Sequence, residues 1–155
     1  MPAVAAAPAR YVGGVGHPSR IGLGLAAVAR PAYITSGRDA ALGVDRGVAQ
    51  LRARAHELLD VAYAGGVRYV DVARSYGLAE QFLAEWLDAR PQMGDVVVGS
   101  KWGYRYVGDW RMDASVHEVK DHSPSAFAEQ LEQTRALLGD RLAVYHVHSA
   151  TLESG

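Results

Sequence analysis

Two kinds of segment alternate along this chain, and this alternation constrains the fold more than any other feature of the sequence. Short runs of valine, leucine and aromatic residues are followed by longer runs in which apolar residues recur every three or four positions. Strands that are separated by helices form a parallel sheet with right-handed crossovers, which leaves a doubly wound sheet or a barrel. The strands are expected at 21–26, 67–71, 95–100 and 142–148, and the helices at 45–64, 78–89 and 123–138.

Residues that favour helix ends mark several of these boundaries. Asp45 can cap the first helix, and the glycines at 65 and 66 end it. Ser123 followed by Pro124 is typical of a helix start. The loop 102–122, of about 21 residues, has a length that in a compact domain is usually functional or disordered. Its aromatic residues indicate a lid or pocket wall over a substrate, or the anchoring of a long loop.

The composition is that of one folded domain, and it excludes several classes of function. Of the 155 residues, 49% are hydrophobic and 21% are charged, and the formal net charge is -1. Mixed charge of this kind offers no case for binding nucleic acid or an anionic membrane. The absence of cysteine excludes disulfides, thiolate metal sites and a cysteine nucleophile.

The first residues predict neither a signal peptide nor a transmembrane helix. Residues 1–20 are rich in alanine, glycine and proline, and they predict a poorly ordered lead-in to a domain over 21–155. No run approaches the ~18 apolar residues of a membrane span, and no basic head precedes residues 1–9. A cytoplasmic location is therefore expected.

Polar residues at the carboxyl ends of the expected strands decide between the two architectures. Asp71, Lys101 and His148 stand where three successive strands end. Both architectures place active sites there, but a barrel brings these ends together around one axis. A carboxylate at the end of an apolar strand costs free energy unless a cation meets it, so Asp71 should pair with Lys101. The sequence thus predicts an α/β chain that forms part of a (β/α)8 TIM barrel.

Three motifs of this chain, in the order in which they occur, resemble the signature of the aldo-keto reductase family. The resemblance runs from about residue 21 to the last residues of the chain. The motifs are Asp71-x-Ala73-x-x-Tyr76-Gly77-x-x-Glu80, Ser100-Lys101-Trp102-Gly103 and Leu142-x-Val144-Tyr145-x-Val147-His148.

The resemblance implies a barrel that binds a nicotinamide cofactor, usually NADP(H), without a Rossmann domain and reduces aldehydes and ketones. It implies that Tyr76 is the general acid, that Lys101 favours its ionisation and that Asp71 holds Lys101. His148 would orient the substrate carbonyl. Val72, where the family commonly has threonine, and the longer loop after Lys101 are departures that bear on substrate fit.

The resemblance also suggests contacts for cofactor and substrate. NADP(H), or NAD(H), would meet the segment after the first strand together with Asp71, and Trp102 would join His148 at the substrate. The cofactor contacts expected in that segment are Gly24, Leu25 and Ala26.

Other motifs and function classes are weaker alternatives. Gly22 and Gly24 lack the third glycine and the helix of a dinucleotide fingerprint. His146-x-His148 resembles the ligand pair of barrel hydrolases, but no further metal ligands cluster with it, so no metal is expected and a packed core imidazole is expected for His146. A non-catalytic relative that senses a cofactor or acts as a scaffold also remains open.

The length of the chain is short for the fold that it predicts. A barrel of this type needs about 200 residues or more, and only four strands and three helices are expected here. The chain is therefore expected to be an N-terminal part of a barrel, inactive alone. The unpaired edges of its outer strands predict self-association.

Overall fold

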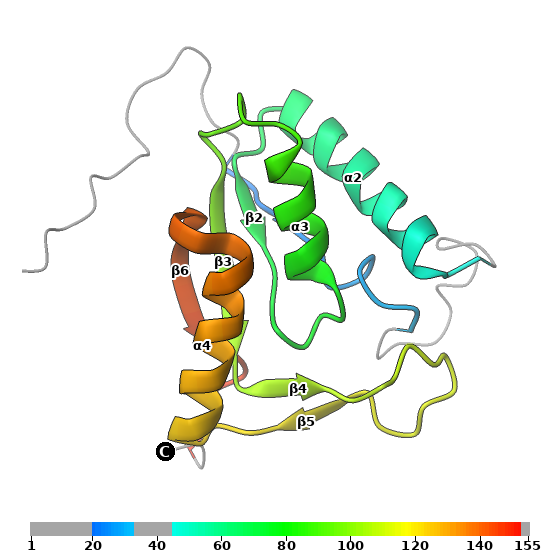
Figure 1. Cartoon of the computed structure of the whole chain (residues 1–155), viewed down its shortest axis with the longest axis vertical. Helices are drawn as coiled ribbons and strands as arrows, with labels where there is room; N and C mark the ends of the chain where they lie inside the picture. The colour runs from blue at the N-terminus through cyan, green and yellow to red at the C-terminus, as the bar shows by residue number, and fades with distance from the viewer. Residues whose placement is uncertain (1–19, 33–44, 153–155) are drawn as a thin grey trace, which may run out of the picture.

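The protein is described by a computed structural model that covers residues 20–32 and 45–152. The expected lead-in over 1–20 falls almost wholly outside these residues. The described part forms one α/β unit with a four-stranded sheet, a two-stranded sheet and three α-helices (Figure 1).

The main sheet is parallel throughout, as the alternation of segments predicts. Its strand order is β1-β2-β3-β6, and each neighbouring pair runs parallel. Consecutive strands that pair in this order, with a helix in each crossover, form the arrangement of part of a (β/α)8 barrel. The strands are β1 (Leu23–Gly24), β2 (Tyr69–Asp71), β3 (Val97–Trp102) and β6 (Leu142–Val147).

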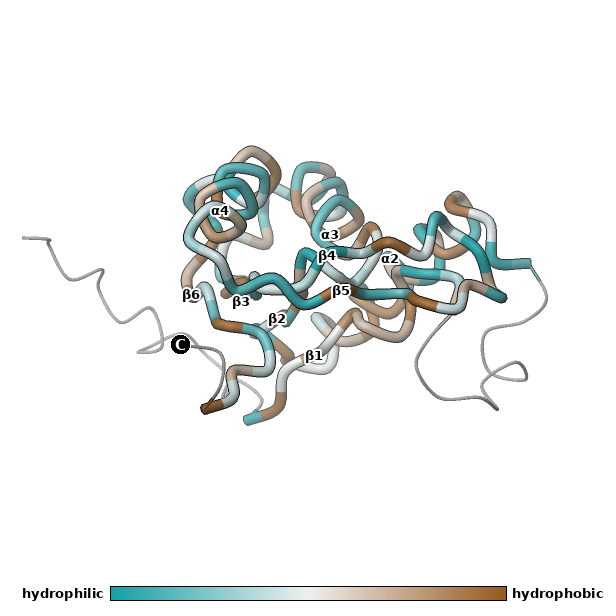
Figure 2. The backbone as a smooth tube through the Cα atoms, turned by 90° about the horizontal axis from the view of Figure 1, so that it is seen from below, coloured by the Kyte–Doolittle hydropathy of each residue, from teal (hydrophilic) through white to brown (hydrophobic). Residues whose placement is uncertain are grey.

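Three helices cover one face of this sheet (Figure 2). They are α2 (Val48–Ala64), α3 (Ala79–Asp88) and α4 (Pro124–Leu138), and a 3-10 turn, η1 (Gly139–Arg141), joins α4 to β6. The core lies between the helices and the sheet, where apolar residues at helical spacing on α2 and α3 meet the strands. Its fully buried members include Leu25, Leu51, Leu59, Val72, Phe82, Leu83, Trp86 and Val98.

The helix boundaries agree with the expected ones except at the start of α2. Gly47 is the N-cap of α2, and Asp45 instead accepts a hydrogen bond from the backbone N–H of Gly47 at 3.0 Å. The prediction of Asp45 as the cap was wrong, because its side chain forms a local turn before the helix begins. Helix α4 starts as predicted, since the Ser123 hydroxyl accepts from the backbone N–H of Ala126 at 3.2 Å.

The segment expected as a long loop contains a β-hairpin. Strands β4 (Tyr104–Tyr106) and β5 (Glu118–Lys120) pair antiparallel and lie beside the end of the main sheet at which β3 ends (Figure 1). The hairpin thus adds a rigid wall near the carboxyl ends of the strands, where the candidate site residues stand.

The face of β6 that turns away from the helices is exposed to solvent. His146 and Val144 are both exposed, so the expectation that His146 is a core imidazole was wrong. The physical reason is that the helices cover the other face of the sheet, and no described element lies over this one (Figure 2). No helix in 20–32 or 45–152 is both long enough and apolar enough to span a membrane.

Candidate active site

The ion pair that the strand ends predict is present at the end of the sheet. Lys101, inside β3, places Nζ 2.5 Å from Oδ2 of Asp71, the last residue of β2. The same ammonium donates to the backbone carbonyl of Val72 at 3.0 Å. The pair forms here because β2 and β3 run parallel in register, with Asp71 opposite Gly99. Both side chains are partly shielded from water, which strengthens their attraction.

Tyr76 lies directly beside this ion pair. The Lys101 Nζ is 4.6 Å from the centroid of the Tyr76 ring. The loop that carries Tyr76 is held by the residues after β1, since the backbone N–H of Leu78 donates to the carbonyl of Ala29 at 2.9 Å. Gly77 allows this approach, because its φ is +61° and an added Cβ would lie 2.4 Å from the Ala29 oxygen.

His148 completes the cluster from the residue after β6. Its ring is nearly perpendicular to that of Tyr76, at 88° with centroids 5.4 Å apart, and it also contacts the ring of Tyr104 at 5.0 Å. Its backbone N–H donates to the carbonyl of Trp102 at 2.8 Å, which fixes it beside β3. Burial and then the nearby Lys101 ammonium lower the pKa of His148, so the imidazole is neutral at neutral pH.

The structure adds two residues to the surroundings of the site that the sequence did not indicate. Arg30 is fully buried, lies 5.6 Å from the centroid of the Tyr76 ring and forms an ion pair with Glu118 of β5 at 2.6 Å. His122 contributes a ring N–H, on Nε2, to the backbone carbonyl of His148 at 2.9 Å. Neither stands in a periodic position or a motif, so no signal in the sequence marks them.

Trp102 lies apart from the four-residue cluster. Its indole packs against Phe127 of α4, with centroids 5.0 Å apart, and against His122 at 5.6 Å. Successive side chains of a strand point to opposite faces. The Trp102 side chain therefore lies on the face of β3 that the helices cover, whereas the Lys101 side chain points toward the cluster. The structure therefore brings Asp71, Tyr76 and Lys101 together with His148, and it does not bring the Trp102 ring to them.

The segment after β1 borders the cluster on its other side. An added Cβ on Gly24 would meet nothing closer than the Asp71 carboxylate at 4.0 Å, so the backbone leaves room for a ligand beside Asp71. Leu25 is fully buried in the core, and its backbone N–H donates to the carbonyl of Asp71 at 3.0 Å. Any contact of Leu25 with a cofactor would therefore come from its backbone, whereas Gly24 is exposed and Ala26 is partly exposed.

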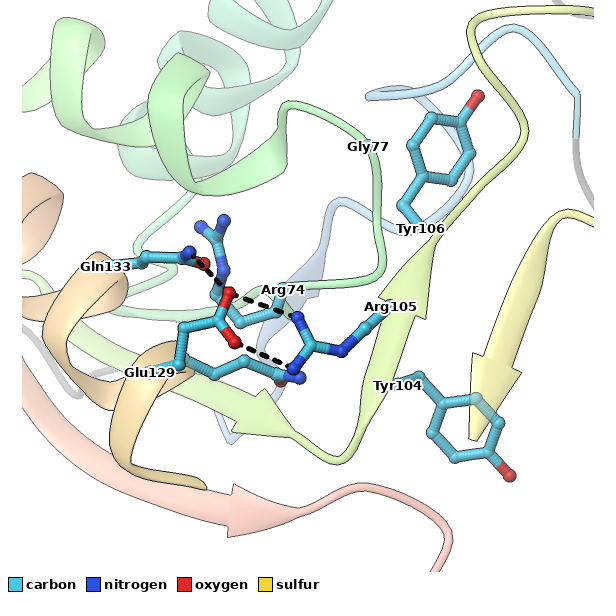
Figure 3. Close-up of a pocket in the computed structure, with 8 residues that line it drawn as sticks. Arg74, Gly77, Tyr104, Arg105, Tyr106, Glu129 and Gln133 are labelled. Carbon is cyan, nitrogen blue, oxygen red and sulfur yellow. Dashed lines mark hydrogen bonds and ion pairs between the residues drawn. The ribbon is translucent and has the colours of Figure 1, made fainter. Parts of the chain in front are cut away.

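A hollow of about 260 Å³ lies between the hairpin and α4 (Figure 3). Arg105 points into it and holds Glu129 through two hydrogen bonds, whereas the rings of Tyr104 and Tyr106 point away. The guanidinium of Arg105 lowers the pKa of the Glu129 carboxyl. None of the four cluster residues lines this hollow, but it borders the candidate active site through Tyr104, whose ring contacts that of His148.

Metal ligands do not gather in the part of the chain that the structure describes. No group of three or more histidine, aspartate or glutamate side chains lies close enough together there to hold a metal ion. His146 and His148 stand on the same strand end, but His146 is exposed and no carboxylate joins the two.

Comparison with known proteins decides the family. The model of the aldo/keto reductase family matches residues 41–151, which is well over half of the chain. The chain belongs to the aldo/keto reductase family. It shows 28% identity to a Pseudomonas aeruginosa protein assigned to the aldo-keto reductases, with a TM-score of 0.53 over 65% of this chain and 37% of that one. No curated protein matches it.

A second solved aldo-keto reductase supports the fold. The chain is 24% identical to aldo-keto reductase AKR11C1 from Bacillus halodurans, with a TM-score of 0.60 over 88% of this chain and 38% of that one. At this identity the likeness supports the fold alone. The chain spans 37% and 38% of the length of these two solved aldo-keto reductases. The family match and the structural likeness confirm the α/β fold predicted from the sequence, which is part of a TIM barrel.

Proposed function

We propose that this chain contributes the catalytic residues of an oxidoreductase that reduces an aldehyde or ketone with NADP(H), or with NAD(H). The observation that carries the proposal is the position of Lys101, whose ammonium contacts both the Asp71 carboxylate at 2.5 Å and the Tyr76 ring at 4.6 Å. A phenol beside a fixed cation, at the open end of a parallel sheet, is suited to general acid catalysis.

Tyr76 is the general acid in this proposal. When bound, NADP(H) or NAD(H) would supply the hydride that the carbonyl carbon accepts. The Tyr76 hydroxyl gives its proton to the carbonyl oxygen as charge builds there, so the product is an alcohol. The Lys101 ammonium stabilises the phenolate that remains, and Asp71 holds Lys101 in place. A proton taken up from the solvent then restores the Tyr76 hydroxyl.

His148 orients the substrate. Its lowered pKa keeps the imidazole neutral, so it does not add a second full positive charge beside Lys101. A neutral imidazole donates one hydrogen bond to the carbonyl oxygen and thereby aims it at the phenol. Trp102 is the second expected substrate contact, and it would act through its backbone or after its ring moves, since the ring packs on Phe127.

The cofactor would lie along the segment after β1. Gly24 leaves space beside the Asp71 carboxylate, and Leu25 and Ala26 continue this rim. A nicotinamide-dependent reduction draws on the cytoplasmic cofactor pool, so a cytoplasmic location belongs to the same proposal. A small carbonyl compound is the expected partner.

We place turnover in a complete barrel and not in these 155 residues alone. The matched part of this chain covers only 37% and 38% of the two solved aldo-keto reductases described above. Within the described sheet β1 and β6 each have one neighbouring strand, and Val144 and Val147 of β6 are exposed. Unpaired edges with exposed apolar side chains favour association, so self-association of this chain is part of the proposal.

The test replaces the proposed acid in a barrel that can turn over. The chain is fused to the remaining strands and helices of the Pseudomonas aeruginosa relative, and oxidation of NADPH is followed with a panel of aldehydes and ketones. Tyr76→Phe should lower kcat by at least about a hundredfold, since general acid catalysis contributes about 10²–10⁴. Tyr63→Phe, a tyrosine on α2 that lies outside the cluster, serves as the control. Retention of the full rate by Tyr76→Phe would show that Tyr76 is not the acid, and tight NADPH binding without turnover would favour the sensing alternative.

A further inference from the structure

We infer that Ser75 is a positioning residue that holds the proton of the neutral His148 on Nε2, the nitrogen that would donate to a substrate carbonyl. The inference rests on the proposed function, in which His148 orients the substrate. It concerns a residue that neither the motifs nor the comparisons assign a role.

Ser75 is a buried hydroxyl with one visible partner. The residue is 1% exposed, and its Oγ lies 3.4 Å from Nδ1 of His148, which is 73 positions away in the sequence. Its backbone is held separately, since the Ser75 carbonyl accepts from the Arg30 guanidinium at 3.2 Å. Within residues 20–32 and 45–152, Nδ1 of His148 is the hydrogen-bond partner of the Ser75 hydroxyl.

The direction of this hydrogen bond follows from what each group must satisfy. A buried hydroxyl whose hydrogen has no acceptor destabilises the folded protein by about 1 to 3 kcal/mol. If Nδ1 carried the proton and donated to Oγ, the Ser75 hydrogen would have no acceptor. If Ser75 donates to an unprotonated Nδ1, both atoms are satisfied, and the proton of the neutral ring lies on Nε2.

The charges around His148 keep the ring neutral, as this arrangement requires. Lys101 on β3 and Arg30 after β1 oppose protonation, whereas Asp71 on β2 and Glu118 on β5 favour it. Burial acts in the same sense as the two cations and is the largest influence, so the pKa of His148 is lowered. The rings of Tyr76 and Tyr104 pack against the imidazole and add no charge in their neutral forms.

The rest of His148 is fixed, which leaves Nε2 as its available donor. The backbone N–H donates to Trp102, and the backbone carbonyl accepts from Nε2 of His122. In the described part of the chain Nε2 of His148 has no hydrogen-bond partner, and it is not among the polar atoms buried without one. It is therefore open to a ligand beside the Tyr76 ring, whose centroid is 5.4 Å from that of His148.

The experiment reads the tautomer directly and needs no turnover. Long-range ¹⁵N–¹H correlation spectra of the ¹⁵N-labelled 155-residue chain distinguish protonated from unprotonated ring nitrogens. The His148 signals are identified among the six histidines by their loss in His148→Gln. We expect Nε2 to be protonated and Nδ1 to be unprotonated in the neutral ring. A proton on Nδ1 would overturn the inference without any further variant.

Ser75→Ala tests whether Ser75 is the cause. A hydroxyl that donates to Nδ1 stabilises the neutral ring, so its loss should raise the protonation midpoint of His148 by about half to one pH unit. A hydroxyl that accepts from Nδ1 would instead stabilise the charged ring, and its loss would lower the midpoint. An unchanged or lowered midpoint therefore overturns the inference.

Ser100→Ala is the matched control. Ser100 is also fully buried, but its hydroxyl donates to Glu80 at 2.6 Å and not to a histidine. Ser100→Ala should leave the protonation midpoint of His148 unchanged. The outcomes are separable from the proposed function, since a wrong tautomer would leave the NADPH assay of Tyr76→Phe standing, and a failed assay would leave the tautomer standing.

Discussion

Removal of the Glu80 carboxylate should destabilise the protein more than removal of any exposed acid. Glu80 is 2% exposed on α3 and forms an ion pair with Arg74. It also accepts hydrogen bonds from two fully buried hydroxyls, Ser100 of β3 at 2.6 Å and Thr134 of α4 at 2.8 Å. One carboxylate thus joins the sheet to two of the helices that cover it.

The expected cost of Glu80→Ala follows from the partners that it leaves behind. A buried hydroxyl without an acceptor costs about 1 to 3 kcal/mol, and Ser100 loses its acceptor outright. The Thr134 hydroxyl still has the Tyr145 hydroxyl at 3.3 Å and costs about 1 kcal/mol, so the total is about 2 to 4 kcal/mol. Arg74 adds little, because its side chain is 25% exposed and can turn to water. Glu80→Gln keeps an oxygen that can accept from a hydroxyl, and it should cost about 1 to 2 kcal/mol.

The assay is urea unfolding of the 155-residue chain, followed by tryptophan fluorescence at several protein concentrations so that association is recognised. Glu85→Ala is the matched control on the same helix, because Glu85 is 36% exposed and its partner Arg52 is 40% exposed. An exposed pair of this kind contributes at most about 1 kcal/mol. A free energy of unfolding for Glu80→Ala that equals that of Glu85→Ala would refute the account of the buried network.

Two further predictions concern the backbone and the alkaline limb of stability. Gly77→Ala should cost about 1 to 3 kcal/mol more than Gly66→Ala in the same urea experiment, since both glycines have positive φ but only the Cβ at 77 would strike a backbone oxygen; equal costs would contradict this. Burial raises the pKa of Tyr145 to about 12, so the folded state keeps a proton that the unfolded state loses above about pH 10. The free energy of unfolding should therefore fall between pH 10 and 12, and Tyr145→Phe should reduce that fall; an identical decline in both proteins would refute it.

The periodic segments were predictable because they depend on local spacing. The apolar residues of α3 recur on one face, and Ser123 with Pro124 begins α4, so both helices were predicted within a residue or two. The strands β2 and β6 were predicted from short apolar runs. The cap of α2 and the hairpin within 102–122 were not, because Asp45 serves a turn and the hairpin depends on pairing across a long connection.

The four residues of the candidate site were predictable for a different reason. Asp71, Lys101 and His148 stand at strand ends, and parallel strands bring these ends to one edge of a sheet. Their motif spacing, with Tyr76, also carried the family resemblance. The direction of the Trp102 ring was not predictable in the same way, because it depends on Phe127 of a helix that follows later.

The amino-acid sequence by itself determined the order of strands and helices, the parallel sheet and the polar groups at its carboxyl end. Periodicity and strand-end position are properties of neighbouring residues, so they can be read without knowing which distant segments meet. Only the tertiary structure decided what surrounds Tyr76 and His148: the buried Arg30 with Glu118, and the hydroxyl of Ser75. These contacts join residues 88 and 73 positions apart, and burial gives them their strength, since a hydrogen bond or charge shielded from water interacts more strongly than an exposed one.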